Sequence, residues 1–457
     1  MIADLKPYPE HKEAGPAWLG KVPRHWDVRP AFGAFLPNHD RNIGMKEKTV
    51  LSLSYGRIII KPPEKLHGLV PESFETYQIV NPGDIIIRTT DLQNDHTSLR
   101  VGMVQNRGII TSAYLALRVS EGVTPDFAYQ LLNVWDMSKA IYGYGSGLRQ
   151  NLDFSHFKRM LVAIPPADEQ AAIVRFLNMA NGRLEQAIRA KRRVIALLTE
   201  QKYATIQRAV TCGLDPAVPF KPSGIPWLSN IPNHWEVLRS KYIYREVDER
   251  STTGEETHLS MSQKLGLIPS SAIKEKRLVS ESYAGAKLCE KGDLVLNRLK
   301  AHLGVFALAQ ERGLVSPDYT VFRPVRELEG PYFEAVYRTP ACRIELRQRA
   351  KGIVQGFWRL YTDDFYDIRL PVPPVDEQKR IMAQLDIDLS GVNTAINRLE
   401  REIALLREYR ISLVVDVVTG KLDVREPASR LSGDAAPVTI SAAGIGEAER
   451  ADEETAA

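Results

Sequence analysis

Two long stretches of the chain carry apolar residues at the spacing of a coiled-coil seam. In the later stretch these residues follow a 4-3-4-3 spacing that Arg410 interrupts, and in the earlier one Asn181, Lys191 and Lys202 interrupt the seam. An apolar repeat of this kind is typical of a helix that packs along its length on another helix. The seam residues are Leu177, Leu184, Ile188, Ile195 and Leu198 in the earlier stretch, and Leu385, Leu389, Val392, Ile396, Leu399, Ile403, Leu406, Leu413 and Val417 in the later one.

Both stretches begin at a double proline. Residues 161–173 read LVAIPPADEQAAI, and residues 370–381 read LPVPPVDEQKRI. Proline cannot donate to a strand ladder, so the apolar strand ends there. The Asp and Glu that follow lie in the first helical turn, where they interact favourably with the helix dipole. We therefore predict long helices over 167–212 and 375–423.

Two helices of matching length in one chain are expected to pack on each other as an intramolecular coiled coil. At 1.5 Å per residue, each would span roughly 60 Å and the pair would act as a rigid spacer. Antiparallel packing would put one globular domain at each end. The pattern leaves one alternative open, in which each helix covers its own domain.

The residues before each helix have a different pattern. Short β-rich runs such as LSLSYGRIII (51–60), DIIIRTT (84–90) and YLALRV (114–119) alternate with Gly and Pro, which is typical of strands separated by turns. The predicted fold class is α+β, with two tandem β-rich domains over 1–166 and 213–374, each followed by one of the long helices.

An internal repeat with a period near 208 residues relates the two halves. AWLGKVPRHWDV (17–28) and PWLSNIPNHWEV (226–237) share six of their twelve residues, and IALLTE (195–200) matches IALLRE (403–408). We expect the aromatic residues of the repeated phrase to anchor the core and its histidines to have a structural role. These residues are Trp18, Trp26, Trp227 and Trp235, with His25 and His234.

Composition and charge narrow the class of protein. The chain is 44% hydrophobic and 25% charged with a net charge of +4, and no apolar run approaches the roughly 20 residues of a membrane span. Residues 424–457 hold three basic and seven acidic side chains and are expected to form a disordered acidic tail. Without this tail, 57 basic and 49 acidic residues remain, which is compatible with a polyanionic partner.

The cysteines and the missing motifs point away from several enzyme classes. Cys212, Cys289 and Cys342 lie far apart in no metal or disulfide spacing, so a reducing cytoplasm is the expected location. We find no GxxxxGK[ST] loop for ATP and no His-x-x-x-His pair for a metal. Pro317-Asp318 has no Glu-x-Lys partner downstream, as a nuclease metal site would need.

The two repeated motifs, in order and twice, resemble the specificity subunit of type I restriction-modification systems, and the resemblance covers residues 17–423. It implies two target-recognition domains that each read half of a split double-stranded DNA site. It also implies an antiparallel coiled coil that docks two methyltransferase subunits and, through them, restriction and translocase subunits. The family has no catalytic residues of its own, so S-adenosylmethionine, ATP and Mg are expected only on the partner subunits, with no cofactor and no metal on this chain.

The way in which the two halves diverge agrees with this resemblance. The opening phrases and helix starts match, whereas residues 88–107 and 297–312 hardly match. A scaffold that meets two copies of one partner needs the same surface twice, and a reader of two different half-sites needs different surfaces in between. A duplicated enzyme would keep its active-site residues alike in at least one copy.

The resemblance implies DNA contacts in the divergent segments, where Arg, Lys, Asn and Gln reach base edges and other cations hold phosphates. The candidates in the first domain are Lys61, Lys65, Arg88, Thr89, Thr90, Gln93, Asn94, Arg100, Arg149, Gln150 and Asn151. Those in the second are Lys274, Lys276, Arg277, Asn297, Arg298, Lys300, His302, Lys351, Gln355 and Arg359. A stand-alone DNA-binding protein and a coiled-coil protein scaffold remain alternative functions.

Overall fold

The computed structural model describes residues 5–62, 73–90, 99–143, 152–262, 265–272, 283–354 and 357–431. These residues form two compact units. Unit 1 comprises the described part of Met1–Lys191 and Arg401–Ala451, and unit 2 that of Arg192–Glu400. Each unit therefore contains one β-rich domain, the first part of the helix that follows it and the last part of the other long helix.

Unit 1 is built on short antiparallel strands around one four-stranded sheet. The sheet order is β4 (Phe35–Pro37), β11 (Leu115–Val119), β8 (Ile85–Ile87), β9 (Val101–Met103). The two-stranded pairs are β1 (His11–Glu13) with β2 (Lys21–Pro23), β3 (Asp27–Pro30) with β12 (Leu161–Ile164), β5 (Leu51–Ser54) with β6 (Arg57–Ile60), and β7 (Gln78–Val80) with β10 (Gly108–Ile110). The helices of this domain are α1 (Pro125–Met137) and α2 (Phe154–Phe157).

Unit 2 repeats the described sheet and strand pairs of unit 1 and adds one further pair, β24 with β25. Its four-stranded sheet has the order β16 (Tyr244–Val247), β23 (Tyr319–Pro324), β20 (Leu294–Asn297), β21 (Phe306–Leu308). The pairs are β13 (Phe220–Ile225) with β14 (Leu228–Pro232), β15 (Glu236–Arg239) with β26 (Arg369–Val372), β17 (Leu259–Ser262) with β18 (Gly266–Pro269), β19 (Lys287–Cys289) with β22 (Gly313–Val315), and β24 (Lys351–Val354) with β25 (Phe357–Arg359). Its helices are α4 (Gly330–Arg338), α5 (Pro340–Arg349) and α6 (Thr362–Tyr366).

The central strand of each main sheet is apolar because both of its faces are covered. All three residues of β8 are buried, and α1 packs over β8 and β9. Thr124 caps α1 by accepting from the Phe127 N–H at 3.4 Å, with Pro125 at the first helical position. Both features are favoured at helix starts. In unit 2, α4 covers β21 in the equivalent place.

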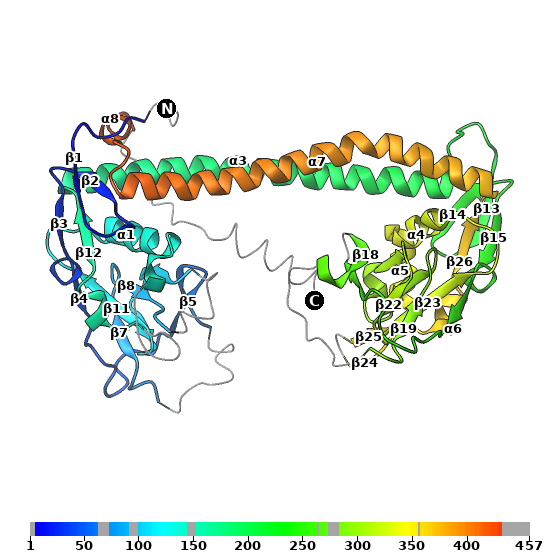
Figure 1. The fold of residues 1–457 in the computed structure, drawn as a ribbon, viewed down its shortest axis with the longest axis horizontal. Helices are drawn as coiled ribbons and strands as arrows, with labels where there is room; N and C mark the ends of the chain where they lie inside the picture. Colours follow the sequence, from blue (N-terminus) through cyan, green and yellow to red (C-terminus); the bar gives the residue numbers. More distant parts are fainter. Residues whose placement is uncertain are drawn as a thin grey trace. The chain divides into compact units, whose positions relative to one another are not determined.

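Both long helices are present, and both begin where the double prolines predict. They are α3 (Ala167–Cys212) and α7 (Val375–Val418), each with Asp and Glu in the first turn. Every seam residue is buried or half-buried. The two helices lie side by side (Figure 1), with Glu185 bonded to Arg410 within unit 1 and Lys202 to Asn393 within unit 2. Within unit 1, Lys191 is also bonded to Glu402. The residue numbers rise from 185 to 191 along α3 while those of the partners fall from 410 to 402 along α7, so the helices are antiparallel.

The helices also cover the domains: the start of each helix packs on its own domain, as the alternative expects, whereas its end packs in the core of the other unit. The core of unit 1 includes Phe176 from the start of α3 and Val417 from the end of α7. The core of unit 2 includes Ile381 from the start of α7 and Val210 from the end of α3. Each domain therefore holds both helices.

Polar residues that interrupt the seam pair across it. Arg410 and Glu185 are buried, with 7% and 10% of their side chains exposed. The counterparts of these two residues at the 208-residue period are Lys202 and Asn393, whose Nζ and Oδ1 atoms are 2.8 Å apart. Asn181 is buried at a seam position, and neither atom of its amide has a hydrogen-bond partner among the described residues.

The end of α7 and the start of the predicted tail differ from the prediction. The helix ends at Val418 rather than at residue 423, because Gly420 adopts a left-handed conformation with φ of 74°. Lys421 N–H then donates to Asp416 O at 2.8 Å, as in a Schellman cap. The prediction of disorder from residue 424 is wrong at its start, because α8 (Arg425–Ser429) forms and Val424 and Ala428 are buried in the core. Residues 432–457 lie outside the described part.

Candidate nucleic-acid interface

In each unit, the repeated opening phrase is fastened to the start of the long helix by one glutamate. The Trp26 indole donates to Glu169 at 2.9 Å, and His25 Nε2 lies 2.6 Å from the same carboxylate. In unit 2, Trp235 and His234 contact Glu377 at 3.1 and 2.7 Å. Both of these indoles are fully buried, so the predicted structural role of the phrase is confirmed for Trp26 and Trp235.

Unit 1 adds two partners to this contact. The Tyr8 hydroxyl donates to Glu169 at 3.1 Å, and Arg425 lies 3.4 Å from it. Burial and the neighbouring Glu169 carboxylate raise the pKa of Tyr8 far above its usual range, so the phenol remains a donor. Lys6 and Asp423 form an antiparallel bridge nearby. The first and last described segments of the chain are thereby joined within unit 1.

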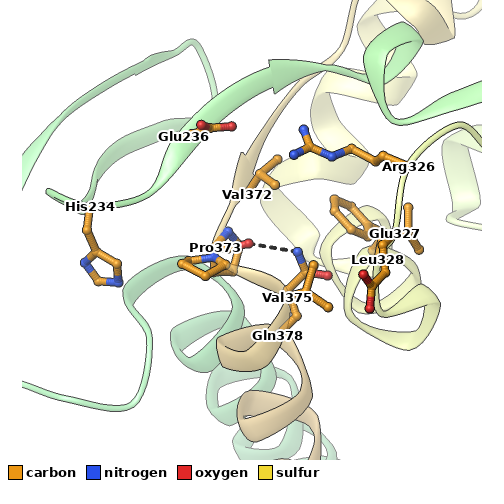
Figure 2. Close-up of a pocket in the computed structure, with 11 residues that line it drawn as sticks. His234, Glu236, Arg326, Glu327, Leu328, Val372, Pro373, Val375 and Gln378 are labelled. Carbon is orange, nitrogen blue, oxygen red and sulfur yellow. Dashed lines mark hydrogen bonds between the residues drawn. The ribbon is translucent and has the colours of Figure 1, made fainter.

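The glutamine of each helix start extends the same frame. Gln378 donates to Pro373 O at 2.8 Å and accepts from the Glu329 N–H at 2.9 Å. Gln170 makes the equivalent bonds in unit 1. A cavity of ≈ 260 Å³ lies beside Gln378, and His234 and Arg326 are among its lining residues (Figure 2). None of the predicted DNA contacts lines this cavity, which is part of the frame.

The predicted DNA-reading segments converge at the end of the central strand in each unit. In unit 1, the Leu152 N–H donates to Thr89 O at 3.0 Å, which joins the segment after β8 to the one before α2. In unit 2, the Leu360 N–H donates to Arg298 O at 3.1 Å. The structure thus brings together segments that lie more than 60 residues apart in the sequence.

Two of the predicted contacts in unit 1 are wrong. Arg100 is fully buried, and its guanidinium donates to the carbonyl oxygens of Arg88 and Thr90 at 3.2 and 2.9 Å. Thr89 is also buried. Arg100 therefore positions the backbone after β8 and is not available to touch DNA. Arg100 follows the polar run DLQNDHTS (91–98) in the sequence, and this pattern gives no sign of its burial.

The remaining described candidates lie at the surface or are half-buried. Arg88, Thr90 and Lys61 are half-buried in unit 1, as are Asn297 and Lys300 in unit 2. Lys351 is exposed and forms an ion pair with Asp364 at 2.8 Å.

Ten of the predicted contact residues, and the side chain of one more, are not among the described residues. Lys65, Gln93, Asn94, Arg149, Gln150, Asn151, Lys274, Lys276, Arg277 and Gln355 lie outside the described residues, as does the side chain of His302.

The candidates predicted from the sequence do not include Asp318, which contacts two of them in unit 2. Arg298 Nε donates to Asp318 O at 3.1 Å, and Arg359 Nη2 lies 3.5 Å from the Asp318 carboxylate. The signal that could have found it is the divergence of the two copies, because the equivalent residue in unit 1 is Ala113.

Two other features are absent from the described residues. There, no group of three or more His, Cys, Asp or Glu residues is arranged to hold a metal ion. No helix in the same part of the chain has the length and apolar character needed to cross a membrane.

Several solved structures resemble this chain, and three of them are compared with it over most of its length. The first, from work on complex assembly and conformational transition of the type I R-M system, has a TM-score of 0.57 at 17% identity and covers 87% of this chain and 98% of its own. This chain shares the fold of that protein from a type I R-M system. The resemblance drawn from the repeated motifs is therefore confirmed at the level of the fold.

Two further solved structures match less closely. The HsdS subunit from Thermoanaerobacter tengcongensis has a TM-score of 0.45 at 16% identity, and the match covers 89% of this chain and 99% of that chain. The type I S subunit from M. genitalium has a TM-score of 0.31 at 12% identity, and the match covers 86% and 96%. No protein-family model matches the chain, and no curated protein matches it.

Proposed function

We propose that this chain is the DNA-specificity subunit of a type I restriction-modification complex in the cytoplasm, and that it recognises a bipartite site with two different half-sites. One observation carries the proposal. The two units share their sheet order and their frame contacts, yet the residues at the end of the equivalent strands differ. Arg88 and Thr89 follow β8, whereas β20 ends with Asn297 and is followed by Arg298.

DNA recognition needs cations that hold phosphates and side chains that reach base edges. Arg88 in unit 1 and Arg298 in unit 2 stand where the reading segments of each unit converge, and both residues are half-buried. Each unit would read one half-site with its own set. A scaffold that binds only proteins would have no need to change these positions between two otherwise matching units.

We also propose that the long helices dock two copies of one methyltransferase subunit, which bring the restriction and translocase subunits into the complex. The seam accounts for part of the repeated IALL-x-E segment, but Leu197 and Leu405 point away from it and are 58% and 63% exposed. These leucines are identical across the repeat although the intrachain packing does not require it. Matching exposed surfaces in both units suit two copies of one partner.

In this proposal the chain contributes recognition and the partners contribute the chemistry. S-adenosylmethionine, ATP and Mg would be bound by the partner subunits. The test is a mobility-shift assay on the full chain, with and without a methyltransferase subunit, over a salt series. A sequence-specific shift with the partner supports the specificity subunit, the same shift without it indicates a stand-alone DNA-binding protein, and no shift in either case indicates a protein scaffold.

Two sets of variants separate reading from docking. Arg88→Ala or Arg298→Ala should weaken DNA binding and leave assembly intact, and unchanged affinity for the cognate site would contradict the assignment. Leu197→Asp and Leu405→Asp should reduce co-purification of the methyltransferase subunit. Ile387→Asp is the matched control, because Ile387 is 69% exposed on α7 and is not repeated at the 208-residue period. Equal losses from all three aspartate variants would contradict the docking proposal.

A further inference from the structure

The surface at the end of β20 in unit 2 combines two arginines with one aspartate. Arg298 donates from Nε to Asp318 O at 3.1 Å and from Nη2 to Pro317 O at 3.3 Å. The Arg359 guanidinium lies 3.5 Å from the Asp318 carboxylate, and these two side chains are 38% and 57% exposed. The hydrogen bond from the Leu360 N–H to Arg298 O fixes the two arginine-bearing segments beside each other.

Asp318 stands in a turn that does not require it. The Tyr319 N–H donates to Ser316 O at 3.0 Å, and the Asp318 N–H donates to Ser316 Oγ at 3.3 Å. The Asp318 side chain takes no part in either bond. The turn would therefore form with another residue at this position.

In unit 1 the equivalent turn forms without an aspartate. There the same turn is closed by the Tyr114 N–H to Thr111 O at 3.2 Å, and the Ala113 N–H donates to Thr111 Oγ1 at 3.3 Å. Unit 1 thus has Ala113 where unit 2 has Asp318. It also has Thr89 in the place of Arg298. The frame is shared, and the charged group is presented in unit 2 alone at these positions.

A carboxylate at this position has a cost for binding to the DNA backbone, because it repels phosphates. A surface that held only phosphates would bind better with the arginines and without Asp318. Reading base edges gives the carboxylate a use. In the major groove, Asp accepts from the N4 amino group of cytosine, and Arg donates to O6 and N7 of guanine. Arginine and aspartate side by side match the two edges of a G·C pair.

We propose that Asp318, together with Arg298 and Arg359, reads a G·C base pair in the half-site contacted by unit 2, and that Asp318 is a specificity-determining residue. The inference rests on the proposed function. In the free protein the carboxylate also holds Arg359 close to Arg298, so the donors and the acceptor are brought together before DNA arrives.

The experiment is selection from a randomised duplex library by the full chain in complex with its methyltransferase subunit. Wild type is compared with Asp318→Asn, Asp318→Ala and Arg359→Ala. Glu311→Gln is the control for the loss of an exposed acid elsewhere in unit 2. We expect both Asp318 variants to relax the preference at one G·C position of one half-site by roughly 10- to 100-fold. Arg359→Ala should relax the same or the adjacent position, and the other half-site should keep its full preference.

The outcomes separate this inference from the function on which it rests. If wild type enriches no sequence, the proposed function fails. If wild type enriches a bipartite site and the Asp318 variants keep every preference, the proposed function stands and the inference is overturned. A uniform loss of affinity at all positions, or relaxation at an A·T position, also overturns it. Asp318→Asn preserves side-chain volume and guards against misfolding of the alanine variant, which circular dichroism would detect.

Discussion

The buried ion pair between Glu185 and Arg410 allows the packing of α3 on α7 to be tested by substituting each partner alone and then both together. With 10% and 7% of these side chains exposed, neither charge can turn to water when its partner is removed. Removing one partner of a buried pair costs about 3–5 kcal/mol, whereas replacing both with apolar residues is close to neutral or stabilising. We therefore expect Arg410→Met and Glu185→Leu each to lower the free energy of unfolding by about 3–5 kcal/mol.

The double variant, Glu185→Leu with Arg410→Met, tests whether the two single losses come from one shared ion pair. It should recover to within about 1 kcal/mol of wild type, so that the two single effects are far from additive. Denaturant unfolding measures the free energies of unfolding. Hydrogen exchange of peptides from α3 and α7 shows whether the loss of stability lies in unit 1. Lys202→Met is the matched control, because its half-buried hydrogen bond to the uncharged amide of Asn393 leaves no buried charge behind when it is removed and should contribute less, about 1.5–3 kcal/mol at most. A single variant within about 0.5 kcal/mol of wild type, or a double variant as unstable as the two singles summed, would refute the account.

Three further predictions follow from single positions. Asn181→Leu should stabilise unit 1 by about 1–3 kcal/mol, because it removes an unpaired buried amide. The reverse change at the equivalent position of unit 2, Leu389→Asn, should destabilise that unit. Thermal midpoints that shift in the same direction for both variants would contradict this. Gly420→Ala should lower the midpoint, because φ is 74° there and a Cβ would collide with Pro23. Burial raises the pKa of Glu334 above its ordinary value of 4.5, so the folded protein holds this proton more tightly than the unfolded chain and stability falls as the pH rises through the raised value. Glu334→Gln should remove this pH dependence of the urea midpoint. An unchanged pH dependence in the variant would show that Glu334 is not its source.

The large features of the fold could be predicted because each has a local cause. The double prolines and acidic first turns fix where α3 and α7 begin, and the seam spacing predicts that they pack on another helix. The strand order could not be predicted, since strands such as β8 and β20 are only three and four residues long and pair with distant segments. The end of α7 was also missed, because the helix stops where Gly420 takes up a left-handed conformation, and the seam spacing does not show that stop.

For the candidate site, the segments were predicted better than the individual residues. The divergence between the two copies locates the segments that meet at Thr89 and at Arg298. It does not tell an exposed arginine from one such as Arg100, which is buried against carbonyl oxygens contributed by its own strand neighbours. Asp318 was considered only for a nuclease site, since a lone acid among cations is not a usual signature of DNA binding.

The most direct test of the central claim is single-molecule sequencing of adenine methylation in a host that expresses this chain with its methyltransferase subunit. The account predicts methylation at one split motif with two different half-sites. It also predicts that Arg88→Ala alters one half and Arg298→Ala the other. Methylation that does not depend on the chain, or a motif whose halves both change with either variant, would contradict it.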